Sequence, residues 1–188
     1  YRKLSEHKKV VGIGECGLDY FWEKDEQKRK TQRENFARQV EISFLVNKPL
    51  MIHSRPSQGS MDAYEDVLNI LEKDFASQKE KLRGNVHFFV GDESIAGRFL
   101  KLGFTMSFTG VVTFTNDYDA VLRYLPLSSI LSETDCPYVA PVPYRGKRNE
   151  PAYVTEVVKK IAGIKNISLE EASDILFKNA ERVFFNIA

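Results

Sequence analysis

The chain has 188 residues, of which 43 % are hydrophobic and 28 % are charged, and its net charge is +1. This length and balance favour one globular domain with a sizeable core, so we expect residues 1–188 to form a single domain. The near-neutral charge gives no general affinity for nucleic acid, and any site for a polyanion must therefore be local.

Several features bear on where the protein resides. No stretch approaches the roughly 18 apolar residues that span a bilayer, so we expect no membrane association. The polar residues 1–9 lack the apolar segment of a signal peptide, and Tyr at position 1 indicates that the natural start lies elsewhere. Cys16 and Cys136 cannot form a disulfide framework. We therefore expect a reduced, cytoplasmic protein.

Short apolar runs alternate with helical patterns along the chain. The runs have strand length and composition and span residues 10–14, 49–52, 86–90, 104–108 and 130–132. An initial helix should end near Lys8, and later helices should span residues 27–46, 61–71, 93–102, 116–125, 151–162 and 168–185, the last opening with a capping box. This alternation predicts an α/β fold of parallel units, either an open sheet or part of a TIM-type barrel.

Four metal-capable side chains fall at or near the ends of different predicted strands. They are Glu15, His53, His87 and Asp135. In a barrel the carboxyl ends of the strands meet at one mouth, where catalytic groups collect. Two imidazoles and two carboxylates suit Zn²⁺, Mn²⁺ or Mg²⁺. A ligating histidine also needs an acceptor for its other ring nitrogen.

Taken singly, most of these residues have a simpler explanation. His53 could be a hydrogen-bonded strand-end histidine, His87 a core residue, and Asp135 a helix cap or turn residue. Glu15 is harder to dismiss, because a carboxylate after an apolar run needs a cation or hydrogen bonds to offset its desolvation. The four together favour a metal site.

The same residues lie in motifs that resemble a known family. Residues 12–20, Gly-Ile-Gly-Glu-Cys-Gly-Leu-Asp-Tyr, are similar to the Gly-Glu-x-Gly-Leu-Asp signature of the TatD deoxyribonucleases. Residues 49–55, Pro-Leu-Met-Ile-His-Ser-Arg, resemble their second signature, and residues 133–138, Glu-Thr-Asp-Cys-Pro-Tyr, resemble their third. Residues 179–184 are similar to the closing helix. The resemblance covers the whole chain.

The resemblance implies a fold and a ligand set. The fold is an amidohydrolase-like (β/α) barrel of TIM type, of which residues 1–188 supply about five of eight units as the carboxyl-terminal portion. Glu15 would bridge two divalent metals, His53 and His87 would hold one, and Asp135 would lie beside the other. The family begins with a His-x-His pair, which this sequence lacks, so the resemblance implies that three strands and this pair precede Tyr1. We expect that upstream sequence, or another chain, closes the barrel.

The activity implied is metal-dependent hydrolysis of phosphodiester bonds in DNA, at ends or in single strands. Two metals per intact enzyme (Zn, Mg or Mn) would activate the attacking water. Asp135 and Glu15 would be the catalytic residues. Arg55 and Arg145 are candidates for binding phosphate, and surface salt bridges are the alternative for both. The oligomeric state stays open.

Other interpretations fit the same sequence. The barrel could hydrolyse another ester, an amide or an aminoacyl-tRNA, since fold does not fix substrate. A non-catalytic barrel that has lost a metal is also consistent with the absent His-x-His pair. Finally, Tyr20, Phe21 and Trp22 could stack on an unpaired base or could simply pack a loop onto the barrel.

Overall fold

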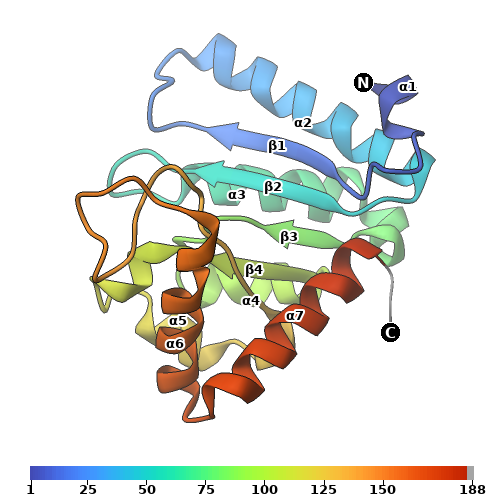
Figure 1. Ribbon diagram of the computed structural model, residues 1–188. Helices are drawn as coiled ribbons and strands as arrows, with labels where there is room; N and C mark the ends of the chain where they lie inside the picture. Colours follow the sequence, from blue (N-terminus) through green and yellow to red (C-terminus); the bar gives the residue numbers. More distant parts are fainter. Residues whose placement is uncertain (186–188) are drawn as a thin grey trace.

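The computed structural model describes residues 1–185 and contains a parallel sheet with the strand order β1-β2-β3-β4-β5 (Figure 1). The strands are β1 (Ile13–Asp19), β2 (Leu50–Arg55), β3 (Gly84–Val86), β4 (Phe104–Phe108) and β5 (Ile130–Ser132). The predicted α/β fold with parallel strands is confirmed. Within residues 1–185 the sheet is open, and β1 and β5 form its two edges.

Helices precede, connect and follow the strands. They are α1 (Arg2–Ser5), α2 (Glu26–Val46), α3 (Asp62–Asn69), α4 (Glu93–Lys101), α5 (Asp119–Tyr124), α6 (Val154–Lys165) and α7 (Leu169–Phe185). Figure 1 shows α2 along β1, α3 and α4 behind the sheet, and the strand arrowheads pointing toward the loop between β5 and α6. No helix in residues 1–185 has the length and apolar character needed to cross a membrane.

Local signals in the sequence account for several helix ends. The side chain of Asp25 accepts a hydrogen bond from the backbone N–H of Lys28 and so begins α2, which ends at Asn47 in a left-handed conformation (φ 51°). The hydroxyl of Ser168 accepts a hydrogen bond from the N–H of Glu171 at 3.1 Å. This contact supplies one half of the capping box predicted for α7.

Three strands have different bounds from those predicted. β2 spans Leu50–Arg55 rather than residues 49–52, because its pairing with β1 continues to Arg55. β1 begins at Ile13 rather than at residue 10 and continues to Asp19, because its pairing with β2 runs from Ile13 to Asp19. β3 ends at Val86, whereas the predicted strand ran to residue 90. The chain leaves the sheet there because Phe88 takes up a positive φ of 47°, a conformation that no strand continues.

Several helices are also shorter than predicted, among them α5, which spans Asp119–Tyr124 rather than residues 116–125. α1 ends at Ser5 instead of near Lys8, and the Ser5 hydroxyl donates to the carbonyl of Arg2 at 2.6 Å, a local alternative to helical bonding. The helix predicted over residues 61–71 keeps α geometry only to Asn69. It then widens into a π-helical turn at Ile70–Asp74.

An aromatic cluster packs α3 and α4 onto the sheet and fixes the loop that follows β3. The ring of Phe89 is buried and lies 5.4 Å from the ring of Tyr64. The Tyr64 hydroxyl also accepts a hydrogen bond from the N–H of Val90 at 2.9 Å. Tyr64 of α3 therefore anchors the segment that begins with His87 and holds its backbone at the carboxyl ends of the strands.

Candidate metal centre

Three of the predicted ligands lie on adjacent strands. Glu15 is within β1, His53 is within β2, and His87 directly follows β3. The pairing of β1 with β2 is irregular between Ile13 and Cys16, and Glu15 lies in this bulge. Bulges redirect a side chain out of the regular alternation. Here the bulge leaves the Glu15 side chain 56 % exposed beside the two histidines.

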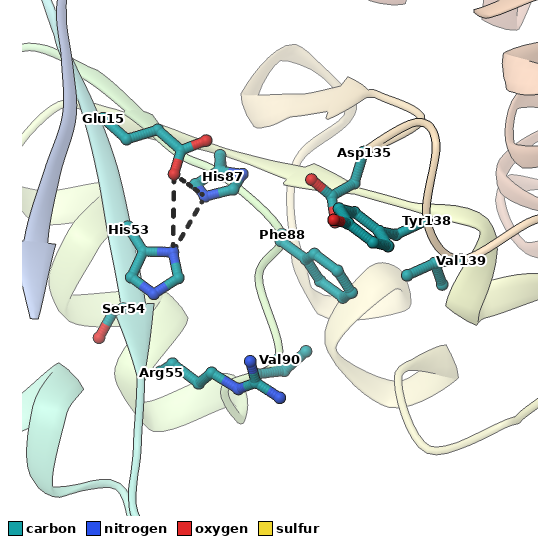
Figure 2. Close-up of a pocket in the computed structure, with 10 residues that line it drawn as sticks. All are labelled: Glu15, His53, Ser54, Arg55, His87, Phe88, Val90, Asp135, Tyr138 and Val139. Atoms are coloured by element: carbon teal, nitrogen blue, oxygen red, sulfur yellow. Dashed lines mark hydrogen bonds and ion pairs between the residues drawn. The ribbon is translucent and has the colours of Figure 1, made fainter. Parts of the chain in front are cut away.

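The three side chains point toward one another (Figure 2). Oε2 of Glu15 lies 3.5 Å from Nε2 of His87 and 3.9 Å from Nδ1 of His53, and these two nitrogens are 3.3 Å apart. The three ligand atoms all lie within 4.8 Å of one another. One cation could therefore contact all three after small side-chain adjustments.

The other nitrogen of each histidine faces a carboxylate. Nε2 of His53 is 3.3 Å from Oδ2 of Asp19, and Nδ1 of His87 is 3.7 Å from Oε1 of Glu133. Such carboxylates fix the tautomer and orientation of a ligating imidazole. The sequence analysis expected acceptors for these second ring nitrogens but did not identify Asp19 and Glu133. Their positions at strand ends could have indicated them, because Asp19 ends β1 and Glu133 directly follows β5.

The electrostatics of the group favour binding of a cation. Burial disfavours a charged imidazole at His87, but Glu133 and the neighbouring carboxylates outweigh this effect and raise its pKa. By contrast, burial and the charge of Glu15 raise the pKa of Cys16 to about 12. The thiol therefore stays protonated and is a poor ligand. A donor set of two imidazoles and one carboxylate fits a divalent metal such as Zn²⁺ or Mn²⁺.

Asp135 lies outside this group but lines the same pocket. The pocket has a volume of about 700 Å³, and Glu15, His53, His87 and Asp135 all line it. Burial raises the pKa of the Asp135 carboxyl. The loop that carries Asp135 is braced by Asn149, a buried residue whose amide donates to the carbonyls of Thr134 at 2.7 Å and Tyr138 at 2.6 Å.

The two predicted phosphate-binding arginines lie in different places. Arg55 ends β2 and lines the pocket. The Arg145 guanidinium instead lies 3.8 Å from the centroid of the Phe114 ring and donates to the carbonyl of Ala140 at 3.1 Å. Arg145 is not among the residues that line the pocket. The structure thus brings Arg55, but not Arg145, to the metal-capable group.

The sequence as a whole settles the family. The family model described as "TatD related DNase" matches residues 1–185. The chain belongs to this family. The TatD-family relatives include the uncharacterized metal-dependent hydrolase YabD of Bacillus subtilis, which is 42 % identical over 97 % of this chain and 68 % of its own length. YcfH of Escherichia coli, also named an uncharacterized metal-dependent hydrolase, is 39 % identical over 97 % of this chain and 66 % of its own length.

Solved structures agree with this membership. The TatD homologue YJJV of Escherichia coli matches 100 % of this chain and 69 % of its own, with a TM-score of 0.84 and 25 % identity. A TatD-family hydrolase of Entamoeba histolytica has the same fold, with a TM-score of 0.76 and 24 % identity over 95 % of this chain and 64 % of its own. The chain therefore spans about two thirds of the length of the relatives it matches. It is a member of a family of metal-dependent hydrolases.

Proposed function

We propose that this TatD-family protein hydrolyses phosphodiester bonds in DNA, in single strands or at ends. The observation that carries the proposal is the convergence of Glu15, His53 and His87 in a pocket that Asp135 also lines. When bound, a divalent metal supplies a Lewis acid that polarises a phosphate oxygen and lowers the pKa of water. Two metals per intact enzyme is part of the proposal.

The side chains of the pocket have distinct roles in this reaction. Glu15, His53 and His87 would hold the metal. Asp135 accepts the proton of the attacking water as a general base. The guanidinium of Arg55 binds a phosphate group of the DNA, for which its planar fork of donors is suited. Asp19 and Glu133 keep the two imidazoles in place.

The proposal is tested by assaying the protein after chelation and after addition of Zn²⁺, Mn²⁺ or Mg²⁺. The substrates are methyl p-nitrophenyl phosphate, an end-labelled DNA strand, a carboxylic ester and an amide. We expect metal-dependent cleavage of both phosphodiesters. Glu15→Gln and His53→Asn should lower bound metal and reduce kcat/KM by about 100-fold or more, whereas Asp135→Asn should reduce kcat with metal still bound.

His7→Asn is the matched control, because His7 is the third histidine of the chain, is exposed and is not among the residues that line the pocket. Its metal content and activity should equal those of the wild type. If the protein cleaves only the carboxylic ester or the amide, the proposed nuclease activity is wrong and the protein is a hydrolase of another class. A protein that binds no metal at saturating concentration would contradict the proposal outright.

A further inference from the structure

The pairing of β1 with β2 places an aromatic turn beside an arginine. Asp19 at the end of β1 is opposite Arg55 at the end of β2, and the N–H of Tyr20 donates to the carbonyl of Arg55 at 2.8 Å. Phe21 and Trp22 follow directly. These two rings and Arg55, named the aromatic ledge from here on, therefore lie together at the ends of β1 and β2, and Arg55 is the member that also lines the metal-side pocket.

The ledge has a defined geometry. The rings of Phe21 and Trp22 meet edge to face, with centroids 4.7 Å apart and an interplanar angle of 86°. The Arg55 guanidinium lies in the corner between them, 4.5 Å from the Phe21 centroid and 5.5 Å from the Trp22 centroid. Stacking of this kind holds a guanidinium in place without using its hydrogen-bond donors.

The ledge is also tied to the metal-capable group. Oδ1 of Asp19 accepts hydrogen bonds from the N–H groups of Phe21 at 3.1 Å and Trp22 at 3.4 Å. Oδ2 of the same carboxylate lies 3.3 Å from Nε2 of His53. One side chain thus fixes both the aromatic turn and a candidate metal ligand, which sets the spacing between the ledge and the reacting centre.

The charge of Arg55 has no ion-pair partner, and most of the surface of Trp22 has no contact, within residues 1–185. Arg29, Arg33 and Arg98 each pair with a carboxylate, but Arg55 forms no ion pair with any residue in 1–185. The indole of Trp22 is 73 % exposed, so most of its surface contacts no protein atom in this part of the chain. A free cation and a free aromatic face at one site match a phosphate and a base.

Space for a ligand continues past the ledge. A second cavity of about 560 Å³ is lined by Phe21, Arg55, Met61, Val90 and Tyr118, among others. Arg55 and Val90 line both this cavity and the metal-side pocket. A chain of nucleotides that passes the metal-capable group would therefore meet Arg55 next.

We propose that the aromatic ledge binds the nucleotide adjacent to the scissile phosphodiester. Arg55 binds its phosphate, and the indole of Trp22 stacks on its base. The inference rests on the proposed nuclease function and deepens it, because stacked neighbours cover the faces of the internal bases of a duplex, whereas an unpaired base can turn a face toward the indole. The ledge therefore makes single-stranded DNA the preferred substrate over a blunt duplex.

Binding is measured first, without catalysis. Trp22 is the single tryptophan of the chain, so its fluorescence reports on the ledge. Titration with oligothymidylate in the presence of a chelator should quench this emission, and a blunt duplex of the same length should not. The Trp22→Phe variant should lack this emission, which assigns the fluorescence change to Trp22. Emission that stays unchanged at saturating oligothymidylate would overturn the inference.

Substrate selectivity provides a second test. Trp22→Leu should lower the ratio of kcat/KM on a DNA strand to kcat/KM on methyl p-nitrophenyl phosphate by about tenfold, within the range expected for loss of one stacked base. Phe177→Leu is the matched control, since Phe177 is a comparably exposed aromatic (65 %) on α7. It should leave the ratio unchanged. An unchanged ratio in Trp22→Leu would count against the ledge.

Arg55→Gln keeps the inference testable if Trp22→Leu fails to fold. Loss of one phosphate contact should reduce the slope of log affinity against log salt for a single strand by about 0.7. An unaltered slope would contradict the role of Arg55. If the wild type cleaves neither phosphodiester, the proposed function fails, whereas the fluorescence titration still decides whether the ledge binds DNA.

Discussion

At the scale of single residues, the metal-capable group depends on what lies behind the two histidines. Asp19 and Glu133 contact the ring nitrogens that face away from Glu15. Both carboxylates also hold backbone, since Asp19 fixes the turn at Phe21 and Oε1 of Glu133 accepts a hydrogen bond from the N–H of Phe88. Phe88 is the residue with φ of 47° that redirects the chain after β3. Each carboxylate therefore positions an imidazole and the adjoining backbone together.

Replacement of these carboxylates should weaken metal binding without removing a ligand. We expect Glu133→Gln and Asp19→Asn each to lower metal affinity by about 10- to 100-fold, because the amide no longer stabilises the orientation and basicity of the imidazole. Competition with a chromophoric chelator measures the affinity directly. Glu41→Gln is the control, since Glu41 is an exposed residue of α2. Unchanged affinity in both test variants would show that the carboxylates do not support the ligands.

At the scale of elements, the site depends on how closely β1 approaches β2. Gly17 is opposite His53 in the register and has φ of 143°. A Cβ added there would lie 1.9 Å from the carbonyl oxygen of His53, which is backbone and cannot move aside. A side chain at position 17 would therefore push the strand that carries Glu15 away from the strand that carries His53.

Gly17→Ala should accordingly cost about 3 kcal/mol or more of unfolding free energy and reduce metal affinity as well. Gly163→Ala is the matched control. Gly163 lies in α6, and a Cβ there would meet nothing within 4 Å. Alanine should stabilise that helix by about 0.5–1 kcal/mol. Urea unfolding measures both variants, and equal effects of the two substitutions would contradict the close-approach argument.

At the scale of the whole molecule, an ion pair joins the π-helical turn after α3 to α4. Arg98 donates to both carboxylate oxygens of Glu72, at 3.1 and 2.7 Å. These hydrogen bonds hold the pKa of Glu72 below its ordinary value. Because the pKa is lower in the folded state, the pair stabilises the fold above the unfolded-state pKa of about 4.3. That contribution is lost as the pH falls through the folded-state pKa.

Glu72→Gln should therefore destabilise the protein at neutral pH by about 1 kcal/mol, the size expected for a partly exposed two-pronged pair. The difference from the wild type should shrink toward zero at an acidic pH below the folded-state pKa, where Glu72 is protonated in both states. Urea unfolding at the two pH values measures this difference. A gap that stays constant with pH would show that the charge of Glu72 contributes nothing.

Much of the fold was predictable because it depends on local chemistry. The β4 and β5 segments have the predicted bounds, since each is a short apolar run next to a turn. Ser168 marked the start of α7 through a side chain that bonds within three residues. The predicted bounds of β1 and β2 were wrong because their mutual pairing, a contact between distant residues, decides them, and the predicted end of β3 was wrong because Phe88 turns the chain out of the sheet.

The sequence by itself determined that metal-capable residues lie within or shortly after several parallel strands, because strand and helix periods are local properties. Only the tertiary structure decided which atoms meet. It brought Glu15 to His53 and His87 through a bulge, separated Arg55 from Arg145, and assigned Asp19 and Glu133 as the carboxylates behind the imidazoles. These outcomes depend on backbone direction after each strand and on packing between distant segments, which residue types alone do not specify.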